Sequence, residues 1–372
     1  MRILINCSNL KVGGGLQVAD SICQSLDRFS QHQFVVVLSS PLSNTYAAIQ
    51  GLDNVKVFSY DIKNNIRTLV FGRDVFLDSL VEKEKSDIVI TIFGPSRWNP
   101  KCEHLCGFAR PHLVLSQSLF FSKLKKISRL KLILSNILLK YFFKRSTNNF
   151  YTENSYISSK LQNILPNSKV YTITNYYNQI YDTPEKWIIR KLPQFDGVTL
   201  LTVTAPYPHK NLQITLKVSE VLRQKYPNFN FRFVMTIDER DFPSIPNDLK
   251  KNFFLIGKVD ISECPSLYRQ ADIMFQPSLL ECFTATYPEA MRMEVPIVTT
   301  DLEFARGLCE EAALYYAPLN PEAAADAIYQ VVSDESLRSV LIDKGTFQLK
   351  KFDTYKQRVE KLMEIAENLV NN

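Results

Sequence analysis

The sequence predicts an α/β protein made of two doubly wound domains in tandem. The chain has 372 residues, and a domain typically takes roughly 100–200 residues. Short apolar runs alternate with amphipathic segments, a pattern typical of parallel sheets covered by helices on both faces. The alternation stops at residues 178–196, where the periodicity is lost, and then restarts. These three observations predict two sheets joined by a linker.

In the first half, the apolar run at 2–7 predicts a strand, and the segment 13–29 predicts a helix because its apolar residues recur at helical spacing. A second helix is expected at 155–165. The remaining apolar runs predict strands at 33–40, 55–60, 87–93, 103–109, 148–154 and 169–175. We therefore expect an N-terminal Rossmann-like domain over residues 1–177.

In the second half, helical patterns lie at 210–227, 320–345 and 352–370. Strands are expected at 198–205, 231–237, 252–259, 271–278 and 296–300. We place the C-terminal Rossmann-like domain at 197–351 and a final helix at 352–372. Ligands of doubly wound sheets bind outside the carboxyl ends of the strands, so a cleft between two such domains is the expected site.

Composition narrows the function classes. The formal net charge of +6 is too small to make the whole chain a nucleic-acid binder. The seven cysteines are scattered and odd in number, and the start "MRILINC" lacks the apolar core of a secretory signal. No run of 18 apolar residues is present. We expect a cytoplasmic protein without a membrane-spanning helix.

The stretch "QPSLLECFTATYPEAMRMEVPIVTT" carries the strongest motif, with Glu281 and Glu289 eight positions apart. Between them, the backbone N–H groups of Thr284, Ala285 and Thr286 precede a helix that Pro288 helps to start. Such a turn suits a diphosphate. Two carboxylates on either side of it can accept hydrogen bonds from the ribose and the sugar of a nucleotide sugar.

Two further loops follow expected strands. Lys210 and Asn211 stand at the start of a helix, where a lysine can neutralise a departing diphosphate. The triplet Gly13, Gly14 and Gly15 follows the first strand. It is not the G-x-G-x-x-G fingerprint of dinucleotide-binding domains, which disfavours a Rossmann dehydrogenase.

Residues 198–332 resemble the C-terminal domain of family-4 glycosyltransferases. Glu281 and Glu289 fit the spacing of the family's two glutamates, and "PEAM", "VPIVTT" and "AALYYAPLNPEAAADAI" follow in the family's order. Where the family usually has "EGFG", this chain has "ECFT", so Cys282 and Thr284 replace glycines. The resemblance implies the GT-B fold, a retaining mechanism without a metal, and a last helix that packs on the N-terminal domain.

The resemblance also implies roles for residues outside the motif. Lys210 matches the lysine of a basic pair, whereas the arginine of that pair has no obvious counterpart and His209 is the nearest candidate. Gly257 and Lys258 would lie beside the nucleotide base, and the glycine triplet would face the cleft. His112, which follows a strand, is the candidate for a histidine near the reacting sugar, with Arg110 beside it.

A metal site is disfavoured. Cys102, His104 and Cys106 alternate along an expected strand and share one face, but adjacent ladder positions converge poorly on one tetrahedral ion and no fourth ligand is near. The chain has no Asp-x-Asp motif to hold a metal-bound diphosphate. We expect neither a metal nor another cofactor.

A basic segment near 119–145 predicts contact with a membrane. Residues 118–146 hold eight Lys or Arg and no acid. On a helical wheel Lys125, Lys126, Arg129, Asn136, Lys140 and Lys144 fall on one side, and Leu124, Ile127, Leu134, Leu138 and Tyr141 fall on the other, where Lys131 interrupts the apolar residues. A basic amphipathic helix suits an anionic bilayer. The alternative is a helix that packs its apolar stripe inward.

Each residue also has a purely structural explanation. Glu281 could be a solvated loop residue, and Glu289 could be a favourable charge at the start of a helix. The glycine triplet could form a tight turn, and His112 could be a loop histidine without a chemical role. Taken together, the residues favour a glycosyltransferase that uses a UDP-, GDP- or dTDP-sugar. Its expected acceptor is a lipid-linked glycan of a bacterial capsule, O-antigen or exopolysaccharide, at the inner face of the cytoplasmic membrane. A nucleotide-sugar epimerase and a catalytically idle scaffold of a polysaccharide assembly complex are the alternatives.

Overall fold

The computed structural model describes residues 1–371 and divides into two compact units. Unit 1 consists of Met1–Gln117, Leu124–Asn175 and the chain from Asp353 onward. Unit 2 consists of Ser118–Lys123 and Tyr176–Phe352. Each unit has its own sheet and its own hydrophobic core.

Unit 1 is built on a seven-stranded parallel sheet with the order β3-β2-β1-β4-β5-β6-β7. Its central strand β1 (Arg2–Cys7) is buried from Ile3 onward, which explains its apolar sequence. The other strands are β2 (Gln33–Leu38), β3 (Val55–Ser59), β4 (Ile88–Thr91), β5 (Glu103–Gly107), β6 (Asn149–Thr152) and β7 (Lys169–Thr172). The strand order reverses between β1 and β4.

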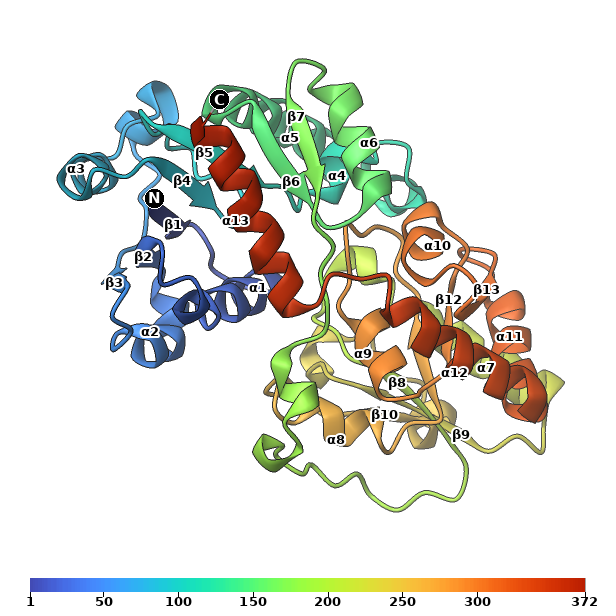
Figure 1. The fold of residues 1–372 in the computed structure, drawn as a ribbon. Coiled ribbons are helices and arrows are strands. Elements are labelled where there is room, and N and C mark those ends of the chain that lie inside the picture. The colour runs from blue at the N-terminus through green and yellow to red at the C-terminus, as the bar shows by residue number, and fades with distance from the viewer. Residues whose placement is uncertain (372) are drawn as a thin grey trace. The chain divides into compact units, whose positions relative to one another are not determined.

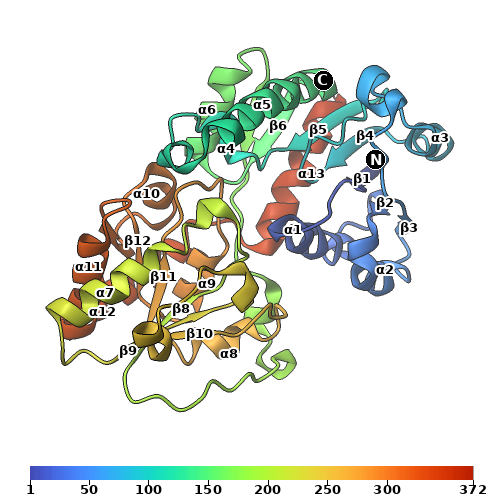
Figure 2. The same ribbon diagram turned by 180° about the vertical axis from the view of Figure 1, so that it is seen from behind.

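Helices cover both faces of this sheet. The last helix, α13 (Tyr355–Asn371), lies along one face and α5 (Lys126–Ser146) along the other (Figures 1 and 2). The other helices of unit 1 are α1 (Gly14–Cys23), α2 (Ser43–Ile49), α3 (Val75–Glu84), α4 (Pro111–Val114) and α6 (Ser155–Ile164). The buried row of α13 joins the same core as β1 and β2, and its members are Val359, Leu362, Met363 and Ala366. The last helix is therefore an integral part of unit 1.

Unit 2 is built on a six-stranded parallel sheet with the order β10-β9-β8-β11-β12-β13. Its strands are β8 (Val198–Thr202), β9 (Phe231–Met235), β10 (Phe253–Leu255), β11 (Ile273–Gln276), β12 (Ile297–Thr300) and β13 (Ala313–Tyr316). Its helices are α7 (Ile214–Lys225), α8 (Cys264–Tyr268), α9 (Thr286–Arg292), α10 (Glu303–Cys309), α11 (Pro321–Ser333) and α12 (Glu335–Leu349). The order of this sheet reverses between β8 and β11.

Several elements differ from the sequence prediction. The helix expected at 320–345 is two helices, because Asp334 leaves the helical conformation and its side chain caps α12 by accepting a hydrogen bond from Leu337 N at 2.9 Å. The strand expected at 252–259 ends at Leu255, shortly before Gly257 adopts a positive φ of 72°. Strand β13 was not expected.

The segment 178–196 contains two short 3₁₀ turns, η5 (Gln179–Asp182) and η6 (Pro184–Lys186), and the chain passes from unit 1 to unit 2 just before it. None of the described helices combines the length and the apolarity that crossing a membrane would require.

Candidate functional site

The topology of unit 2 brings two of the predicted residues together. Lys210 ends the turn η7 (Pro208–Lys210) after β8, and Glu281 lies in the loop after β11. Because β8 and β11 are parallel neighbours, both loops leave the same edge of the sheet at the point where its order reverses. Leu279 N donates a hydrogen bond to the carbonyl of His209 at 2.8 Å, which fastens one loop to the other.

Lys210 and Glu281 form a close ion pair. Lys210 Nζ lies 2.6 Å from Glu281 Oε1, and the two side chains are only 13% and 8% exposed. A buried cation and a buried carboxylate each need a partner, and here each supplies the other.

Glu289 is the most deeply buried of the predicted carboxylates. It lies in α9, is 3% exposed and accepts a hydrogen bond from Tyr268 Oη at 3.2 Å. Burial raises the pKa of Glu289 to about 7, against the lowering effect of hydrogen bonds from Tyr181 and Tyr268 and of the charge on Lys210. The protonation of this carboxyl therefore changes near neutral pH.

The turn before α9 contains the residues predicted to face a diphosphate. Thr284 Oγ1 and Thr286 Oγ1 are 2.8 Å apart and share one hydrogen bond. Ala285 adopts a helical conformation just before α9, and its carbonyl accepts a hydrogen bond from Glu289 N at 2.9 Å. The turn thus lies between Glu281 and Glu289 in the chain and is hydrogen-bonded to the backbone of Glu289.

Asn211 adopts a left-handed conformation with a φ of 52° and is 2% exposed. An asparagine tolerates this conformation better than most residues. Its Oδ1 accepts a hydrogen bond from Gln213 Nε2 at 3.3 Å, while its Nδ2 has no hydrogen-bond partner among the described residues. A buried amide donor beside Lys210 is available to a ligand.

His209 does not replace the arginine that the family resemblance calls for. Its ring stacks on Tyr207 at 5.5 Å between centroids, and the edge of Phe120 meets it at 6.1 Å. Burial lowers the pKa of His209, so the imidazole is neutral at pH 7 and adds no positive charge to the site.

The two residues predicted to lie beside the base follow β10. Gly257 has a φ of 72°, and a Cβ at this position would lie 3.3 Å from Asp238 Oδ1, so glycine suits both the conformation and the space. Lys258 is exposed next to it.

The remaining predicted residues lie in unit 1. Gly13 has a φ of 80° in the turn that opens α1, Gly14 has open space around its Cβ position, and Gly15 packs against Phe93. These glycines stand after β1, where the order of this sheet reverses. His112 lies half-buried in α4, just after Arg110, and its carbonyl accepts a hydrogen bond from Asn136 Nδ2 at 2.8 Å.

His104 is buried in the core, and both of its ring nitrogens have hydrogen-bond partners. Its two ring nitrogens lie 2.9 Å from Thr91 Oγ1 and 2.9 Å from the carbonyl of Ser146. Burial lowers the pKa of His104 to about 4. Both nitrogens are therefore engaged in hydrogen bonds within the core.

Sequence reasoning missed Tyr181 and Tyr268, which surround Glu289. Tyr181 lies in the segment expected to be a linker, and Tyr268 ends α8, so neither stood near a recognisable motif. Both are fully buried. The linker contains several other apolar residues, so Tyr181 did not stand out in the sequence.

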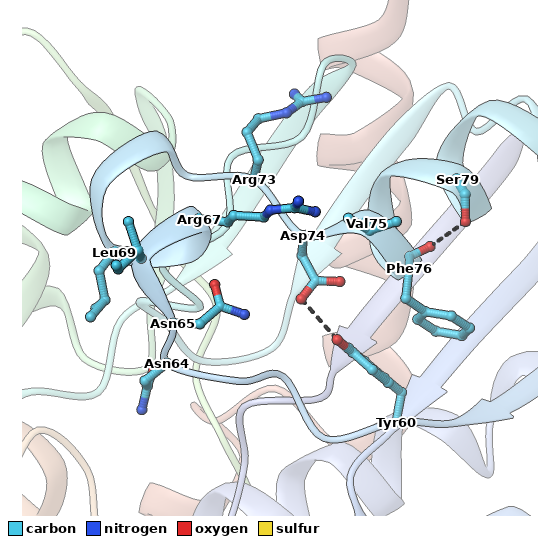
Figure 3. A pocket seen from close by; sticks show the side chains of 11 residues that line it. Tyr60, Asn64, Asn65, Arg67, Leu69, Arg73, Asp74, Val75, Phe76 and Ser79 are labelled. Atoms are coloured by element: carbon cyan, nitrogen blue, oxygen red, sulfur yellow. Dashed lines mark hydrogen bonds between the residues drawn. The ribbon is translucent and has the colours of Figure 1, made fainter.

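A pocket of about 960 Å³ lies elsewhere, in unit 1, and none of the predicted site residues lines it (Figure 3). In its wall Tyr60 Oη donates to Asp74 Oδ2 at 2.9 Å. It is lined by Tyr60, Asn64, Asn65, Ile66, Arg67, Leu69, Arg73, Asp74, Val75, Phe76 and Ser79.

Comparison with known proteins identifies the domain that contains most of the candidate site. Residues 197–334 match the model of a family described as glycosyl transferases group 1. The chain carries a group 1 glycosyltransferase domain. Glu281, Glu289 and Lys210 all lie within this glycosyltransferase domain, and the family predicted from the sequence is confirmed.

One curated relative and two solved structures are similar to the chain. A phosphatidyl-myo-inositol mannosyltransferase of Mycolicibacterium smegmatis is 26% identical over 149 residues, which is 39% of this chain and 39% of that protein. The aligned part thus spans about two fifths of the relative.

The structure of a glycosyltransferase from Rickettsia africae aligns with a TM-score of 0.70 at 15% identity, covering 100% of this chain and 98% of that one. The Anabaena protein HepE, solved with UDP and glucose, aligns with a TM-score of 0.65 at 13% identity over 99% of this chain and 100% of that one. At these identities the alignments establish the fold. The chain therefore has the GT-B fold, as the sequence predicted.

Proposed function

We propose that the protein is a retaining glycosyltransferase that moves a sugar from a nucleotide diphosphate sugar to a hydroxyl acceptor. The observation that carries this proposal is the cluster at the carboxyl edge of the second sheet. There Lys210 is paired with Glu281 at 2.6 Å, and Glu289 is buried across the phosphate-receiving turn. The family of residues 197–334 supports the same reaction class.

In the proposed reaction, the donor diphosphate binds to Lys210 and to the backbone N–H groups of the turn 284–286. Glu281 accepts hydrogen bonds from the donor sugar, and Glu289 accepts them from the ribose. As the bond from the anomeric carbon to the phosphate oxygen breaks, the lysine stabilises the charge on the leaving group. The acceptor oxygen attacks from the same side, and its proton passes to an oxygen of the departing phosphate.

UDP is the first nucleotide to test. A structural neighbour of this chain was solved with UDP and glucose, and the residues near Gly257 offer backbone groups to a base. GDP and dTDP sugars remain the competing donors.

We further propose that the acceptor is a lipid-linked glycan of a bacterial surface polysaccharide and that residues 119–145 contact the membrane. In α5, the apolar residues opposite its buried face point away from the core of unit 1, each at least 45% exposed. They are Ile127, Leu130, Ile133, Leu134, Ile137, Leu138 and Tyr141, and we call them the α5 stripe. Lys126, Lys131, Lys140 and Lys144 flank the stripe on the same helix. This arrangement suits an anionic bilayer surface.

The activity is tested by incubating the purified chain with UDP-, GDP- and dTDP-sugars, with and without membrane lipid extracts, and measuring release of the nucleoside diphosphate. We expect release that depends on acceptor. Lys210→Ala and Glu289→Ala should each lower turnover by about 10²-fold or more, because charge stabilisation and positioning are lost. Lys217→Ala and Glu322→Gln change exposed residues of the same unit and serve as matched controls.

Other outcomes separate the alternatives. A changed sugar on the recovered nucleotide without any acceptor would identify an epimerase. If the protein bound none of the three nucleotides at millimolar concentration, the transferase proposal would be wrong, and a catalytically idle scaffold would be the remaining alternative.

A further inference from the structure

A second apolar segment of unit 1 stands next to the α5 stripe in space, although it is far away in sequence. It is the turn Ile66–Phe71, which contains the helical turn η3 (Arg67–Phe71) between β3 and α3. Ile66 is 72% exposed, Val70 57% and Phe71 66%. Three large apolar side chains that protrude together from a short turn cost solvation free energy unless something covers them.

The turn is held rigidly from within. Thr68 is buried, and its hydroxyl donates to the carbonyls of Lys63 and Asn65 at 2.7 and 3.0 Å. Thr68 N donates to Asn65 Oδ1 at 3.1 Å. Because these bonds satisfy polar groups inside the turn, its apolar side chains are presented outward in a fixed arrangement.

Arg145 fastens this turn to the end of α5. Its guanidinium donates to the carbonyls of Thr68, Leu69 and Val70, and to that of Arg97, at 2.8–2.9 Å. Gly72 makes the approach possible, because a Cβ there would lie 3.3 Å from Arg145 Cζ and its φ is 66°. Arg145 thus fixes the position of the turn relative to α5.

The same guanidinium also touches the α5 stripe. Its Cζ lies 5.4 Å from the centre of the Tyr141 ring, and Tyr141 is the last residue of the stripe. Tyr141 and Val70 are therefore both neighbours of Arg145. In Figure 2 the C-terminal end of α5 accordingly points toward the segment between β3 and α3. Arg145 thus links the C-terminal end of the α5 stripe to the backbone of the turn, and we call the two apolar surfaces together the patch.

The turn itself carries positive charge. Lys63 and Arg67 lie between Asp61 and Asp74 with no acid among the residues between these two aspartates, while Arg73 is ion-paired with Asp78 at 3.1 Å. Basic residues beside exposed apolar side chains are attracted to anionic headgroups while the apolar side chains enter the headgroup boundary. The turn also forms one wall of the pocket of unit 1, which Ile66, Arg67 and Leu69 line (Figure 3).

We propose that Ile66, Val70 and Phe71 form a second membrane-inserting element, which enters the same anionic lipid surface as the α5 stripe and is held in place by Arg145. This proposal rests on the membrane contact of α5 proposed above and extends it. Two inserting elements on one rigid unit would fix the orientation of unit 1 on the bilayer, whereas a single helix would leave it free to roll about the helix axis.

The test uses the full chain and vesicles of phosphatidylglycerol and phosphatidylethanolamine, with vesicles of phosphatidylcholine as the uncharged comparison. A Phe71→Trp variant places a reporter on the turn. We expect its fluorescence to shift to the blue with the anionic vesicles and to be quenched by brominated acyl chains. Phe347→Trp is the matched control, since Phe347 is 61% exposed and lies in unit 2. Its fluorescence should not change.

A double variant tests the energetic contribution. Val70→Ser with Phe71→Ser should weaken binding to the anionic vesicles about tenfold or more, because two large apolar groups no longer leave water. Both residues are exposed, so the fold should be retained, which circular dichroism and the thermal midpoint verify. Phe347→Ser should bind as the wild type does.

The outcomes distinguish the two proposals. If the wild-type chain binds the anionic vesicles but the fluorescence of the Phe71→Trp variant is not quenched and the double variant binds equally well, the turn stays in water. This inference is then wrong, while the α5 contact stands. If the wild-type chain does not bind the anionic vesicles at all, both proposals fail together, and the patch is left to a protein partner.

Discussion

Glu289 combines deep burial with a proposed role, binding the ribose, that a charged carboxylate would perform best. Its carboxyl is surrounded by Tyr181 and Tyr268, and burial raises its pKa to about 7. Below this pH the group is mostly neutral, and above it the group is an anion that accepts stronger hydrogen bonds. If Glu289 holds the ribose as proposed, donor affinity depends on its protonation.

We expect the affinity for UDP-glucose to rise about threefold between pH 6 and pH 8, since a hydrogen bond to a charged group is stronger than one to a neutral group by about 1 kcal/mol and the carboxyl is partly ionised already at pH 6. Glu289→Gln should bind more weakly at pH 8 and show no such rise. Titration calorimetry at the two pH values measures both effects. A nucleotide sugar is preferable to free UDP, whose terminal phosphate itself titrates with a pKa near 6.

A rise of equal size in the glutamine variant would assign the pH dependence to another group. His209 would not produce such a rise, because burial lowers its pKa and its protonation at low pH would add a positive charge that strengthens the binding of a diphosphate.

The sequence predicted Glu281, Glu289 and Lys210 as candidates because spacing and position after strands are properties of the chain itself. The contact of Lys210 with Glu281 could be expected only once β8 and β11 were known to be neighbours. Tyr268 could not be predicted, because its role depends on how α8 packs beside α9.

Among the elements, α5 shows where pattern reasoning reaches its limit. The wheel placed most basic residues opposite most apolar ones, with Lys131 on the apolar side, but a wheel cannot tell which stripe meets the core. The structure buries Phe142 and Phe143 and leaves Ile127 and Leu134 in water. Similarly, the pattern at 320–345 remained helical through Asp334, since a cap and a helix interior residue look alike until the turn is seen.

Helix α13 contributes to the stability of unit 1 although it comes last in the chain. Leu362 is 1% exposed in the core that also contains Ile3 and Ile5. Leu362→Ala should lower the free energy of unfolding of unit 1 by about 2–5 kcal/mol, because the transfer of the side chain and the cavity left behind both cost stability. Urea denaturation measures the change.

Glu364→Ala changes an exposed residue of the same helix and should have little effect. Equal stability of the Leu362 variant and the wild type would mean that α13 does not belong to the folded core of unit 1.

Considered as a whole, the molecule has the tandem α/β architecture that alternation of strands and helices predicted. Ligand-binding loops of a doubly wound sheet gather where its strand order reverses, and in both sheets the predicted loops lie at that point. The boundaries were harder to predict, because Ser118–Lys123 joins unit 2 from within the first half of the chain. Ser118 Oγ donates to the carbonyl of Leu279 at 2.8 Å, a contact that no local pattern encodes.

A buried acid of unit 1 should make the stability of that unit depend on pH. Burial raises the pKa of Glu153 from 4.5 to about 7. The folded state thus binds a proton that the unfolded state releases, so this contribution to stability is fully present below about pH 4.5 and is lost as the pH rises through 7. Glu153→Gln stays neutral at every pH and should reduce the loss of stability between pH 5 and pH 8 by at most about 3 kcal/mol.

Trp98 lies in unit 1 and Trp187 in unit 2, so a Trp187→Phe background lets fluorescence follow unit 1 alone during denaturation. Glu364→Gln, at an exposed position, is the matched control. An unchanged pH dependence in Glu153→Gln would show that this carboxyl is already ionised in the folded protein.

The chain leaves unit 1 after Asn175 and returns at Asp353, and these two passages are fastened to one another. Thr174 N donates to Asp353 Oδ2 at 2.9 Å, and Asp353 N donates to Thr174 Oγ1 at 2.6 Å. Residues 176–352 therefore begin and end at neighbouring points, as an inserted domain does. Apart from the short piece at 118–123, unit 2 is one continuous segment of the chain. Exchanging this segment between related enzymes would therefore need only two junctions, and the two junctions lie side by side in unit 1.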